Sequence, residues 1–508
     1  MNYEREPQAW VGAWSERRAA LTPDREALVD AATGRRFTYA DLDRRADRTA
    51  RLLDRFGVRD GERVAVVSRN RPAVVDLFLA TAKTGGVLAP LSHRLAPPEQ
   101  ATLLSGIDPG VVIVEEPFEG DVRRALERID RDPAVLALAA DGDHADEAYS
   151  AALPDDDAPV ETATLAPEDP HLLLHTGGST GTPKETVLPH RTLVWNSLNT
   201  ITAWGLRPDD VTPLTFPTFH TGGWNVITVP LWHMGGTVVL DREVDAGALL
   251  ATVEREAATV LVAVPAVLRR MARHDRWADT DLSTLRVVKS GGGPCREAVM
   301  DRWWDRGVDL SQGYGLTECG PNNFAMPDDW PREKADTVGK PVPHVDVRVV
   351  RDGDAVEQGA VGELELRGPG AADGYRDAPE ESAATFGTWV STGDLARVDE
   401  DGYVSIEGRV KELFVSGGEN VYPVEVERVL AEHPGVEDAV VVPVSDEEWG
   451  QVGRAVVVGE VTLADLQSFC EGRLAGYKHP RDLVLVDALP TSGPEKIDRA
   501  AVRAQYGE

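Results

Sequence analysis

Hydrophobic and polar positions follow one rhythm through roughly the first 300 residues of the chain. Short apolar runs rich in β-branched residues recur there, for example Arg63–Ser68, Val111–Val114 and Thr259–Val264, and longer amphipathic stretches separate them. Strand-length runs that alternate with helix-length segments are typical of parallel sheets with crossover helices. This part of the chain is therefore predicted to form α/β layers with largely parallel sheets.

The pattern changes from Val345 onward. Segments such as VDVRVV and GELELRG alternate apolar and polar residues, and glycines and aspartates occur between them. A period of two predicts half-buried strands joined by turns. We expect a smaller α+β unit in roughly the last hundred residues. Because 508 residues are too many for one hydrophobic core, two or more packed units are expected.

Composition and charge limit the classes of function. The chain is 42% hydrophobic and 27% charged, as in ordinary globular enzymes. Its formal net charge of −32 argues against a nucleic acid partner, because that binding depends on Lys and Arg neutralising phosphates. Three widely spaced cysteines without metal-ligand spacing favour a reducing, cytoplasmic location. We see no signal peptide and no apolar run long enough to predict a membrane span.

An acidic segment lies between two of the expected units. Residues 141–169 include ten Asp or Glu residues and no Lys or Arg. This composition is typical of a solvated surface connection that leads into the next strand. A regulatory or partner-binding segment is the alternative interpretation.

A glycine-rich segment carries the clearest chemical signal. His171–His175 is an apolar run that predicts a buried strand, and Thr176-Gly-Gly-Ser-Thr-Gly-Thr-Pro-Lys184 follows it directly. Glycines let the backbone approach a ligand, hydroxyl groups can donate to phosphate oxygens, and exposed N–H groups form an anion-binding concavity. The segment predicts a phosphate site, although composition alone leaves a plain flexible loop open. The predicted nucleotide-binding residues of this loop are Thr176, Gly177, Gly178, Ser179, Thr180, Gly181 and Lys184.

This loop resembles the signature loop of the adenylate-forming superfamily, which includes acyl-CoA synthetases, nonribosomal peptide adenylation domains and firefly luciferase. One departure is Glu185, where the family usually has glycine. The resemblance implies a large N-terminal domain of stacked, mostly parallel sheets with helices plus a distorted barrel, and a small mobile α+β C-terminal domain. It implies an ATP- and acid-binding domain over residues 1–408, a hinge at 409–411 and a lid domain over 412–508.

Further segments resemble family motifs in the family order. In Gln312–Glu318, the resemblance assigns Thr317 and Glu318 to the nucleotide phosphate and to Mg²⁺. Ser290–Pro294 resembles the turn along adenine, and Thr392-Gly-Asp394 resembles the segment that accepts from the ribose hydroxyls. The resemblance places Arg409 near ribose and Lys411 at the pivot. The nucleotide-binding residues implied by these segments are Gly291, Gly292, Gly293, Pro294, Gln312, Gly313, Tyr314, Gly315, Thr317, Asp394 and Arg409.

The resemblance also implies two half-reactions. The acid and ATP form an acyl-adenylate with release of pyrophosphate, and Lys496 is the candidate for the lysine that assists this step. Its segment, Pro490–Ile497, departs from the family in Glu495, where glycine is usual. The C-terminal domain then rotates and a thiol such as coenzyme A enters, beside Ser416, Gly417 and Gly418. The catalytic residues implied in this way are Lys496, Glu318, Thr317 and His220.

Phe216–Trp224 resembles the segment that lines the acyl pocket. Amino-acid-activating relatives usually carry an aspartate in this region, so its absence argues against an α-amino acid. His220 matches a residue that flanks the reacting carboxylate in fatty and aryl acid enzymes. Small residues near the pocket favour a medium- or long-chain fatty acid or an aryl acid. The implied pocket residues are His220, Thr221, Gly222, Trp224, Asn225, Gly291 and Gly313.

The leading hypothesis is an AMP-forming acid–CoA ligase that uses ATP, Mg²⁺ and coenzyme A. Within the same fold, the acceptor can instead be a carrier-protein thiol, oxygen, or nitrite activated for diazotisation of an aminoaryl acid. A low-turnover nucleotide- or acyl-binding protein is an alternative from a different class. The sequence leaves the oligomeric state open, a homodimer included.

Overall fold

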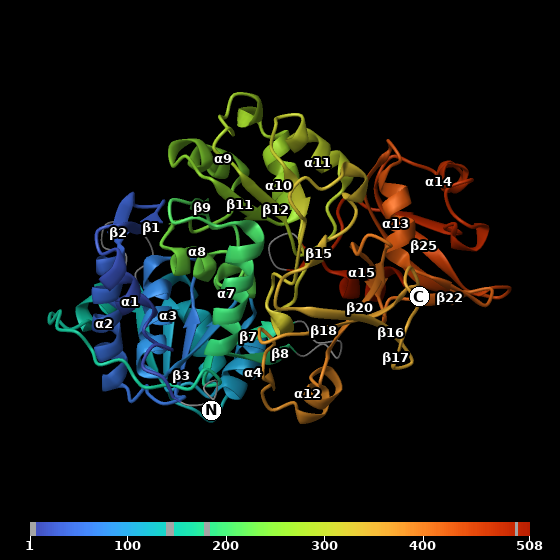
Figure 1. The fold of residues 1–508 in the computed structure, drawn as a ribbon. Helices are drawn as coiled ribbons and strands as arrows, with labels where there is room; N and C mark the ends of the chain where they lie inside the picture. Colours follow the sequence, from blue (N-terminus) through green and yellow to red (C-terminus); the bar gives the residue numbers. More distant parts are fainter. Residues whose placement is uncertain (1–6, 139–146, 177–182, 493–495, 508) are drawn as a thin grey trace.

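The computed structural model describes residues 7–138, 147–176, 183–492 and 496–507. Layers of sheets and helices form a large N-terminal part, and a smaller C-terminal part lies beside it, orange to red in Figure 1. The predicted α/β fold with a separate α+β unit is thereby confirmed. The exact boundaries at residues 408, 409–411 and 412 stay predictions.

The largest sheet has seven strands in the order β19-β8-β7-β4-β3-β5-β6. Five neighbouring strands run parallel, β8 pairs antiparallel with β7, and β19 pairs antiparallel with β8. The strands are β3 (Arg63–Val67), β4 (Val87–Leu91), β5 (Val111–Glu115), β6 (Ala134–Leu138), β7 (Pro170–Thr176), β8 (Lys184–Pro189) and β19 (Gly374–Tyr375). The apolar runs at residues 63–68 and 111–114 are therefore central strands, buried on both faces as parallel strands usually are.

A second sheet, β2-β1-β10-β9, stands beside the first, and a three-stranded parallel sheet, β11-β12-β13, follows it in the chain. The strands are β1 (Glu26–Asp30), β2 (Arg35–Thr38), β9 (Val211–Pro213), β10 (Thr237–Leu240), β11 (Val260–Ala263), β12 (Val287–Ser290) and β13 (Leu310–Gln312). The helices of these layers are α1 (Trp14–Leu21), α2 (Tyr39–Arg55), α3 (Pro72–Thr84), α4 (Pro97–Ile107), α5 (Glu119–Leu126), α6 (Glu147–Ala152), α7 (His190–Trp204), α8 (Thr228–Met234), α9 (Ala246–Arg255), α10 (Pro265–Arg273) and α11 (Glu297–Trp304).

Helix α3 shows how the layers share a core. Its residues 72–83 are all buried, because the helix contributes to the apolar cluster that joins the two larger sheets. Its lysine, Lys83, is 1% exposed and pairs with Asp43 and Asp47 of α2. A buried cation of this kind is tolerated only with such partners.

An antiparallel sheet, β17-β16-β18-β20-β21, lies between the N-terminal layers and the C-terminal part (Figure 1). It contains the alternating segments VDVRVV and GELELRG as β16 and β18, so their period of two reflects one buried face. The strands are β16 (Asp346–Arg351), β17 (Asp354–Ala355), β18 (Gly362–Arg367), β20 (Val390–Val398) and β21 (Val404–Arg409), with α12 (Pro379–Thr385) nearby and the short pair β14 (Phe324–Ala325) and β15 (Lys340–Pro341) before them.

The C-terminal part is built on a mixed sheet, β23-β22-β25-β24, with β26 parallel to β25. Helices α13 and α14 bury their apolar sides against one cluster on this sheet, and α15 packs on another. Its elements are β22 (Phe414–Ser416), β23 (Glu419–Val421), α13 (Pro423–Ala431), β24 (Val436–Asp446), β25 (Gly450–Gly459), α14 (Leu463–Cys470), β26 (Asp482–Leu485), β27 (Thr491–Ser492), β28 (Lys496–Ile497) and α15 (Arg499–Tyr506).

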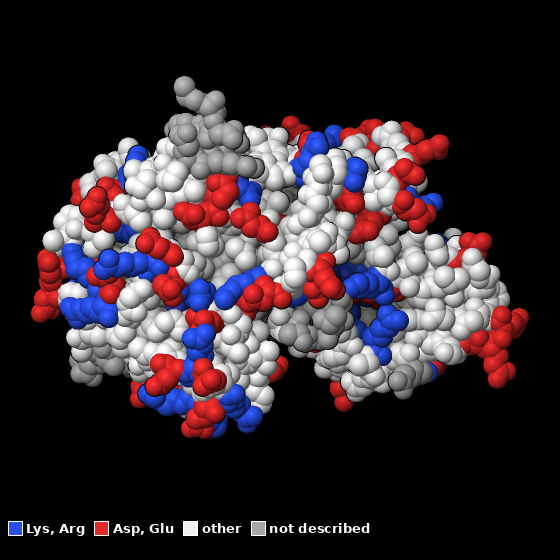
Figure 2. Space-filling model, turned by 90° about the horizontal axis from the view of Figure 1, so that it is seen from below, with Lys and Arg blue, Asp and Glu red and all other residues white. Residues whose placement is uncertain are grey.

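The surface agrees with the acidic composition. Figure 2 shows acidic and basic side chains intermixed over one face, with uncharged areas between them. Within the acidic segment, residues 155–159 are exposed, which fits a solvated connection. Among the helices that the structure describes, none is long and apolar enough to cross a membrane.

Candidate active site

Two glycine-rich turns meet at the carboxyl ends of the parallel strands β12 and β13. The Gly313 N–H donates to the Ser290 carbonyl at 2.8 Å, which holds the two turns side by side. A Cβ added to Gly291 or Gly293 would meet no other atom within 4 Å, so the turn at residues 291–293 borders open space. Open α/β sheets bind ligands at this edge. The turn can therefore take a flat group such as the predicted adenine.

The Gln312 side chain makes two hydrogen bonds to backbone groups, and its contact with the nucleotide stays a prediction. Its side-chain oxygen accepts from the Cys295 N–H at 2.8 Å, and its amide nitrogen donates to the Ala335 carbonyl at 2.6 Å. The amide therefore fixes the segment that follows the adenine turn. Gly315 also serves packing, since an added Cβ would lie 2.0 Å from the Pro321 carbonyl oxygen.

Asp394 and Arg409 face each other across the antiparallel pair β20 and β21. The Arg409 Nε lies 2.9 Å from Asp394 Oδ1, and the Tyr314 hydroxyl donates to Oδ2. Burial and the Asp394 charge raise the pKa of Tyr314, and the Asp394 carboxylate raises the pKa of Arg409. Each oxygen of the Asp394 carboxylate can accept one more hydrogen bond, because it has a second lone pair. The structure thus brings together three predicted nucleotide residues around one acceptor group suited to sugar hydroxyls.

Glu318 lies in a short 3₁₀ turn, Thr317–Cys319, and is 9% exposed. Its Oε1 accepts from the Tyr375 hydroxyl at 2.9 Å, and the Lys184 Nζ lies 4.5 Å from the centre of the Tyr375 ring. Burial and the Glu318 charge raise the pKa of Tyr375. Tyr375 was not expected from the sequence. It reaches the site because β19 pairs with β8 next to the phosphate loop.

Glu318 also fits the metal that the fold family implies. No group of three or more His, Cys, Asp or Glu side chains suited to a metal ion occurs among the described residues. Mg²⁺ usually binds through one or two carboxylates plus substrate phosphates and water. A single carboxylate beside a phosphate loop matches that mode.

The unusual Glu185 points away from Lys184. The two are consecutive on β8, so their side chains lie on opposite faces of the sheet. Glu185 is 9% exposed; its Oε1 lies 3.8 Å from His175 Nε2 and its Oε2 lies 3.8 Å from Arg376 Nη1. A Cβ on Gly106 of α4 would come within 2.3 Å of Oε1. Glu185 therefore occupies a slot on the far side of the sheet from Lys184 and Tyr375.

Part of the phosphate loop lies outside the described residues, namely Gly177, Gly178, Ser179, Thr180 and Gly181. The structure describes the residues that flank them. Thr176 ends β7 and pairs with Lys184 at the start of β8, and the Thr176 hydroxyl lies 3.4 Å from that of Thr186. The two strands thus hold the ends of the loop beside Tyr375 and Glu318.

The predicted acid-binding segment contains both packing and polar residues. His220 precedes the turn Thr221–Gly223, and its ring centre lies 4.6 Å from that of Phe219. The space beside Gly222 is filled, because an added Cβ would lie 2.7 Å from the Phe216 ring. Of the three glycines among the predicted pocket residues, Gly291 borders open space, a Cβ on Gly313 would make ordinary contact with the Ser290 carbonyl oxygen at 3.9 Å, and the space beside Gly222 is filled.

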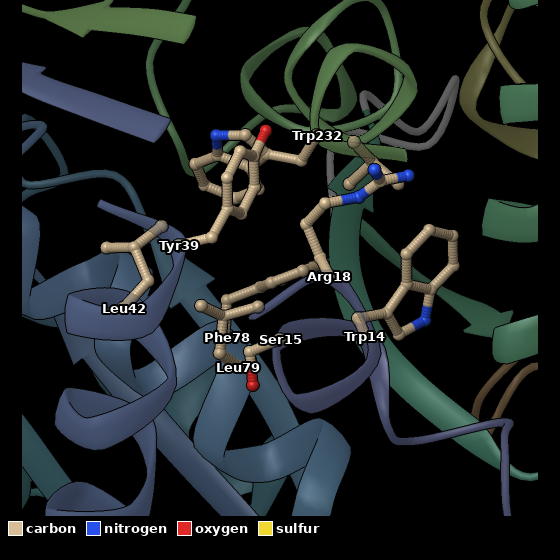
Figure 3. Close-up of a pocket in the computed structure, with 9 residues that line it drawn as sticks. Trp14, Ser15, Arg18, Tyr39, Leu42, Phe78, Leu79 and Trp232 are labelled. Atoms are coloured by element: carbon tan, nitrogen blue, oxygen red, sulfur yellow. The ribbon is translucent and has the colours of Figure 1, made fainter. Parts of the chain in front are cut away.

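Trp224 is fully buried in the core. Its ring stacks on Phe78 with centres 4.3 Å apart, and its indole N–H donates to the Thr218 carbonyl at 2.7 Å. Phe78 also lines a small pocket of about 20 Å³, together with aromatic and aliphatic side chains that include Trp14 and Tyr39 (Figure 3).

Sequence reasoning missed a buried amide cluster beside that segment. The Asn225 carbonyl accepts from Asn196, and Asn322 donates to the Thr200 hydroxyl at 2.7 Å and to the Val226 carbonyl at 2.8 Å. Asn225 also donates from its side chain to the Thr221 hydroxyl at 3.2 Å. The asparagines come from α7, from the Asn225 segment and from the loop after Glu318, so no local pattern indicates the cluster.

The predicted hinge and thiol-side residues lie in the C-terminal connection. The Lys411 carbonyl accepts from Arg503 of α15 at 3.1 Å. Ser416 is fully buried on β22, and Gly417 (φ +59°) packs against the Trp449 ring, where a Cβ would come within 2.5 Å. Gly418 also has a positive φ, +88°. These glycines allow a tight turn that a side chain would strain.

Lys496 begins β28, which pairs with β27 through Ser492. The position of the Lys496 side chain lies outside the described part of the structure, as does Glu495. Arg499, at the start of α15, bonds to Glu412 at 3.2 Å and also to Glu427. The backbone of this region therefore lies next to the predicted hinge, and the catalytic role of Lys496 stays a prediction.

Comparison with known proteins defines the class. Residues 15–376 match the family described as AMP-binding enzyme, and residues 425–496 match the AMP-binding enzyme C-terminal domain. The chain belongs to the AMP-binding enzyme family, which confirms the resemblance of its motifs to the adenylate-forming superfamily.

Individual relatives extend this result over the whole chain. The chain is 37% identical to a feruloyl-CoA synthase of Amycolatopsis sp, covering 98% of this chain and 99% of that protein. It is 36% identical to an indoleacetate–CoA ligase of Aromatoleum aromaticum, covering 97% of each. The ATP-bound structure of MatB from Rhodopseudomonas palustris superposes with a TM-score of 0.91 at 29% identity, covering 99% of both chains. The apo structure of MatB gives 0.80 at 30% identity, covering 98% of this chain and 99% of that one.

Proposed function

We propose that this protein is an AMP-forming acid–CoA ligase, which makes an acyl-adenylate from ATP and a carboxylic acid and then transfers the acyl group to coenzyme A. The main support is the pairing of Asp394 with Arg409 and of Glu318 with Tyr375 and Lys184, together with the turn at residues 291–293, which borders open space. The full-length similarity to acid–CoA ligases supports coenzyme A as the acceptor of the acyl group.

In the first half-reaction, a carboxylate oxygen forms a bond to the α-phosphorus while the bond to pyrophosphate breaks. Both reactants are anions, so catalysis depends on positioning and on neutralising charge. Asp394 accepts from the ribose hydroxyls, and Lys184 brings positive charge to the phosphates. Glu318, oriented by Tyr375, would hold Mg²⁺, which when bound supplies further positive charge at the phosphates. Lys496 adds a cation from the C-terminal domain.

We further propose that the acid is an aryl or arylalkyl acid. The relatives named above are a feruloyl-CoA synthase and an indoleacetate–CoA ligase, and both names indicate acids with aromatic rings. In this chain, the ring of Phe216 occupies the space beside Gly222, and Trp224 is stacked in the core. The Phe216 ring thus fills space beside the predicted acid-binding segment, which favours a flat aryl group over a long alkyl chain. His220 and the Phe219 ring flank the position expected for the reacting group.

The test is a pyrophosphate-release screen over aryl, aminoaryl and fatty acids, each with and without coenzyme A or nitrite. We expect release with an aryl acid and a coenzyme A-dependent thioester product. A nitrite-dependent product without a thioester contradicts the proposed acceptor, and release with fatty acids alone contradicts the proposed acid class.

The same assay tests the predicted lysine. Replacing Lys496 with Ala should lower the rate of adenylate formation by a factor of about 10²–10³, as expected for the loss of a charge that stabilises the transition state. Lys340→Ala, which removes a lysine that lies over the Tyr403 ring, is the control and should leave the rate within about twofold. An unchanged rate in Lys496→Ala shows that the role assigned to Lys496 is wrong.

A further inference from the structure

Three hydrogen bonds join the N-terminal part to the first residues of β24. Asp438 binds Arg269 Nη1 through Oδ2 and Arg296 Nη2 through Oδ1, both at 2.8 Å. Arg296 also donates through Nη1 to the Glu437 carbonyl. We call Asp438, Arg269 and Arg296 the clasp. Its three side chains are only 26–29% exposed, so water screens the charges less than at an open surface.

The two arginines belong to elements that shape the adenine turn. Arg269 lies on α10, which begins directly after β11. Arg296 caps α11 and follows Pro294 of the glycine turn by two residues. The intervening Cys295 is held by the Gln312 amide at 2.8 Å. Arg296 and the turn are therefore consecutive parts of one stretch of backbone, and a shift in the turn moves the Arg296 guanidinium.

The charges of the clasp favour contact between the Asp438 carboxylate and the two guanidinium groups, and so favour the docked C-terminal part. Burial and the charges of Arg269 and Arg273 lower the pKa of Arg296, and Asp438 opposes them. When Asp438 leaves, the guanidinium groups of Arg269 and Arg296 remain near each other without the shared carboxylate, which is unfavourable for two like charges. A further ion pair between the two parts, Arg428 with Asp336, is longer at 3.6 Å and more exposed, so it contributes less.

We propose that Asp438 is a positioning residue whose contact with Arg269 and Arg296 holds the C-terminal domain in the arrangement that forms the adenylate. This proposal rests on the proposed function. The TM-score is 0.91 to the ATP-bound MatB structure and 0.80 to the apo structure of the same protein, so the docked arrangement is nearer to the ATP-bound one. A rotation at residues 409–411 separates Asp438 from both arginines. Transfer to coenzyme A therefore does not require the clasp.

The half-reactions are measured separately in Asp438→Asn. Acid-dependent exchange of pyrophosphate into ATP reports adenylate formation, and single-turnover transfer from the bound adenylate to coenzyme A reports the second step. We expect exchange to fall roughly fivefold to tenfold, as for loss of partly buried charge-assisted bonds, while transfer stays the same or becomes faster. Asp438→Glu, which keeps the charge, should recover most of the exchange rate.

Glu437→Gln is the matched control. It removes one negative charge from the adjacent residue, whose side chain is exposed and makes no ion pair among those that the structure describes. Exchange should stay within about twofold in this variant. Equal losses of both half-reactions in Asp438→Asn, or equal losses in Asp438→Asn and Glu437→Gln, would overturn the positioning role.

A second measurement separates this proposal from the proposed function. Donor and acceptor dyes on the two domains report the docked fraction by energy transfer, with α,β-methylene-ATP as the probe. We expect the probe to increase the docked fraction in the wild type and in Glu437→Gln, and to do so less in Asp438→Asn. A docked fraction unaffected by Asp438→Asn contradicts the clasp. A wild type that exchanges no pyrophosphate with any acid contradicts the proposed function but leaves this measurement valid.

Discussion

A stacked pair of buried histidines should make the N-terminal part sensitive to mild acid. His171 of β7 and His190 of α7 are both fully buried, with ring centres 4.5 Å apart and planes at 3°. The His171 Nε2 lies 3.0 Å from the Phe78 carbonyl oxygen, whereas neither ring nitrogen of His190 has a partner among the described residues. Burial lowers the pKa of His171 to about 4, and burial together with His171 lowers that of His190. Both rings are neutral at pH 7.

The sign of the effect follows from where each state takes up a proton. The unfolded chain protonates His171 near pH 6.5, while the folded protein resists protonation until about pH 4. The free energy of unfolding therefore decreases as the pH falls from 6.5 to 4, and this group causes no further loss below that. At pH 5, His171 alone should cost about 2 kcal/mol relative to pH 7, with a further loss in the same direction from His190.

Urea unfolding at pH 7 and pH 5, followed by tryptophan fluorescence, measures this loss in the wild type and in His171→Phe. Phenylalanine keeps the stacked ring and cannot titrate, so about 2 kcal/mol of the pH dependence should disappear. His190→Phe should also reduce it, and should be neutral or stabilising at pH 7 because it removes two unpaired buried nitrogens. His433→Phe, at a partly exposed site in the C-terminal part, is the control. Equal pH dependence in the wild type and both buried-site variants would refute the reasoning.

Two further predictions concern the site. Gly106→Ala should displace the Glu185 carboxylate, whose Oε1 would lie 2.3 Å from the new Cβ, and should lower the free energy of unfolding in urea by about 1 kcal/mol. The KM for ATP should stay unchanged, because Glu185 lies on the far side of the sheet from Lys184. Gly120→Ala, on a helix with no atom near the new Cβ, is the control and should change neither quantity, and equal stabilities of the two variants contradict this prediction. Tyr375→Phe removes the hydrogen bond to Glu318 but keeps the ring. The kcat for pyrophosphate release should therefore fall about fivefold, which corresponds to roughly 1 kcal/mol for one hydrogen bond. An unchanged kcat would show that this hydrogen bond does not orient the Glu318 carboxylate.

The amino-acid sequence by itself determined the class of this protein, because the motifs that define the class are short and local. Residue types at fixed local spacing indicated a phosphate loop. The turn at 291–293, Asp394 and Arg409 were assigned through the resemblance of short motifs to a known family, and their contacts with the nucleotide stay predictions. Apolar runs such as residues 63–67 were recognisable as strands, since a buried strand needs only a short run of apolar side chains.

Only the tertiary structure decided which distant residues meet. Tyr375 reaches Glu318 because β19 pairs with β8, a contact between segments about 190 residues apart in the chain. The direction of Glu185 depends on the register between β7 and β8, since a shift of one residue would turn it towards the phosphates. Asp438 meets its two arginines only when the C-terminal part is docked. Such contacts depend on how sheets pair and pack, and they cannot be predicted from the local spacing of residues.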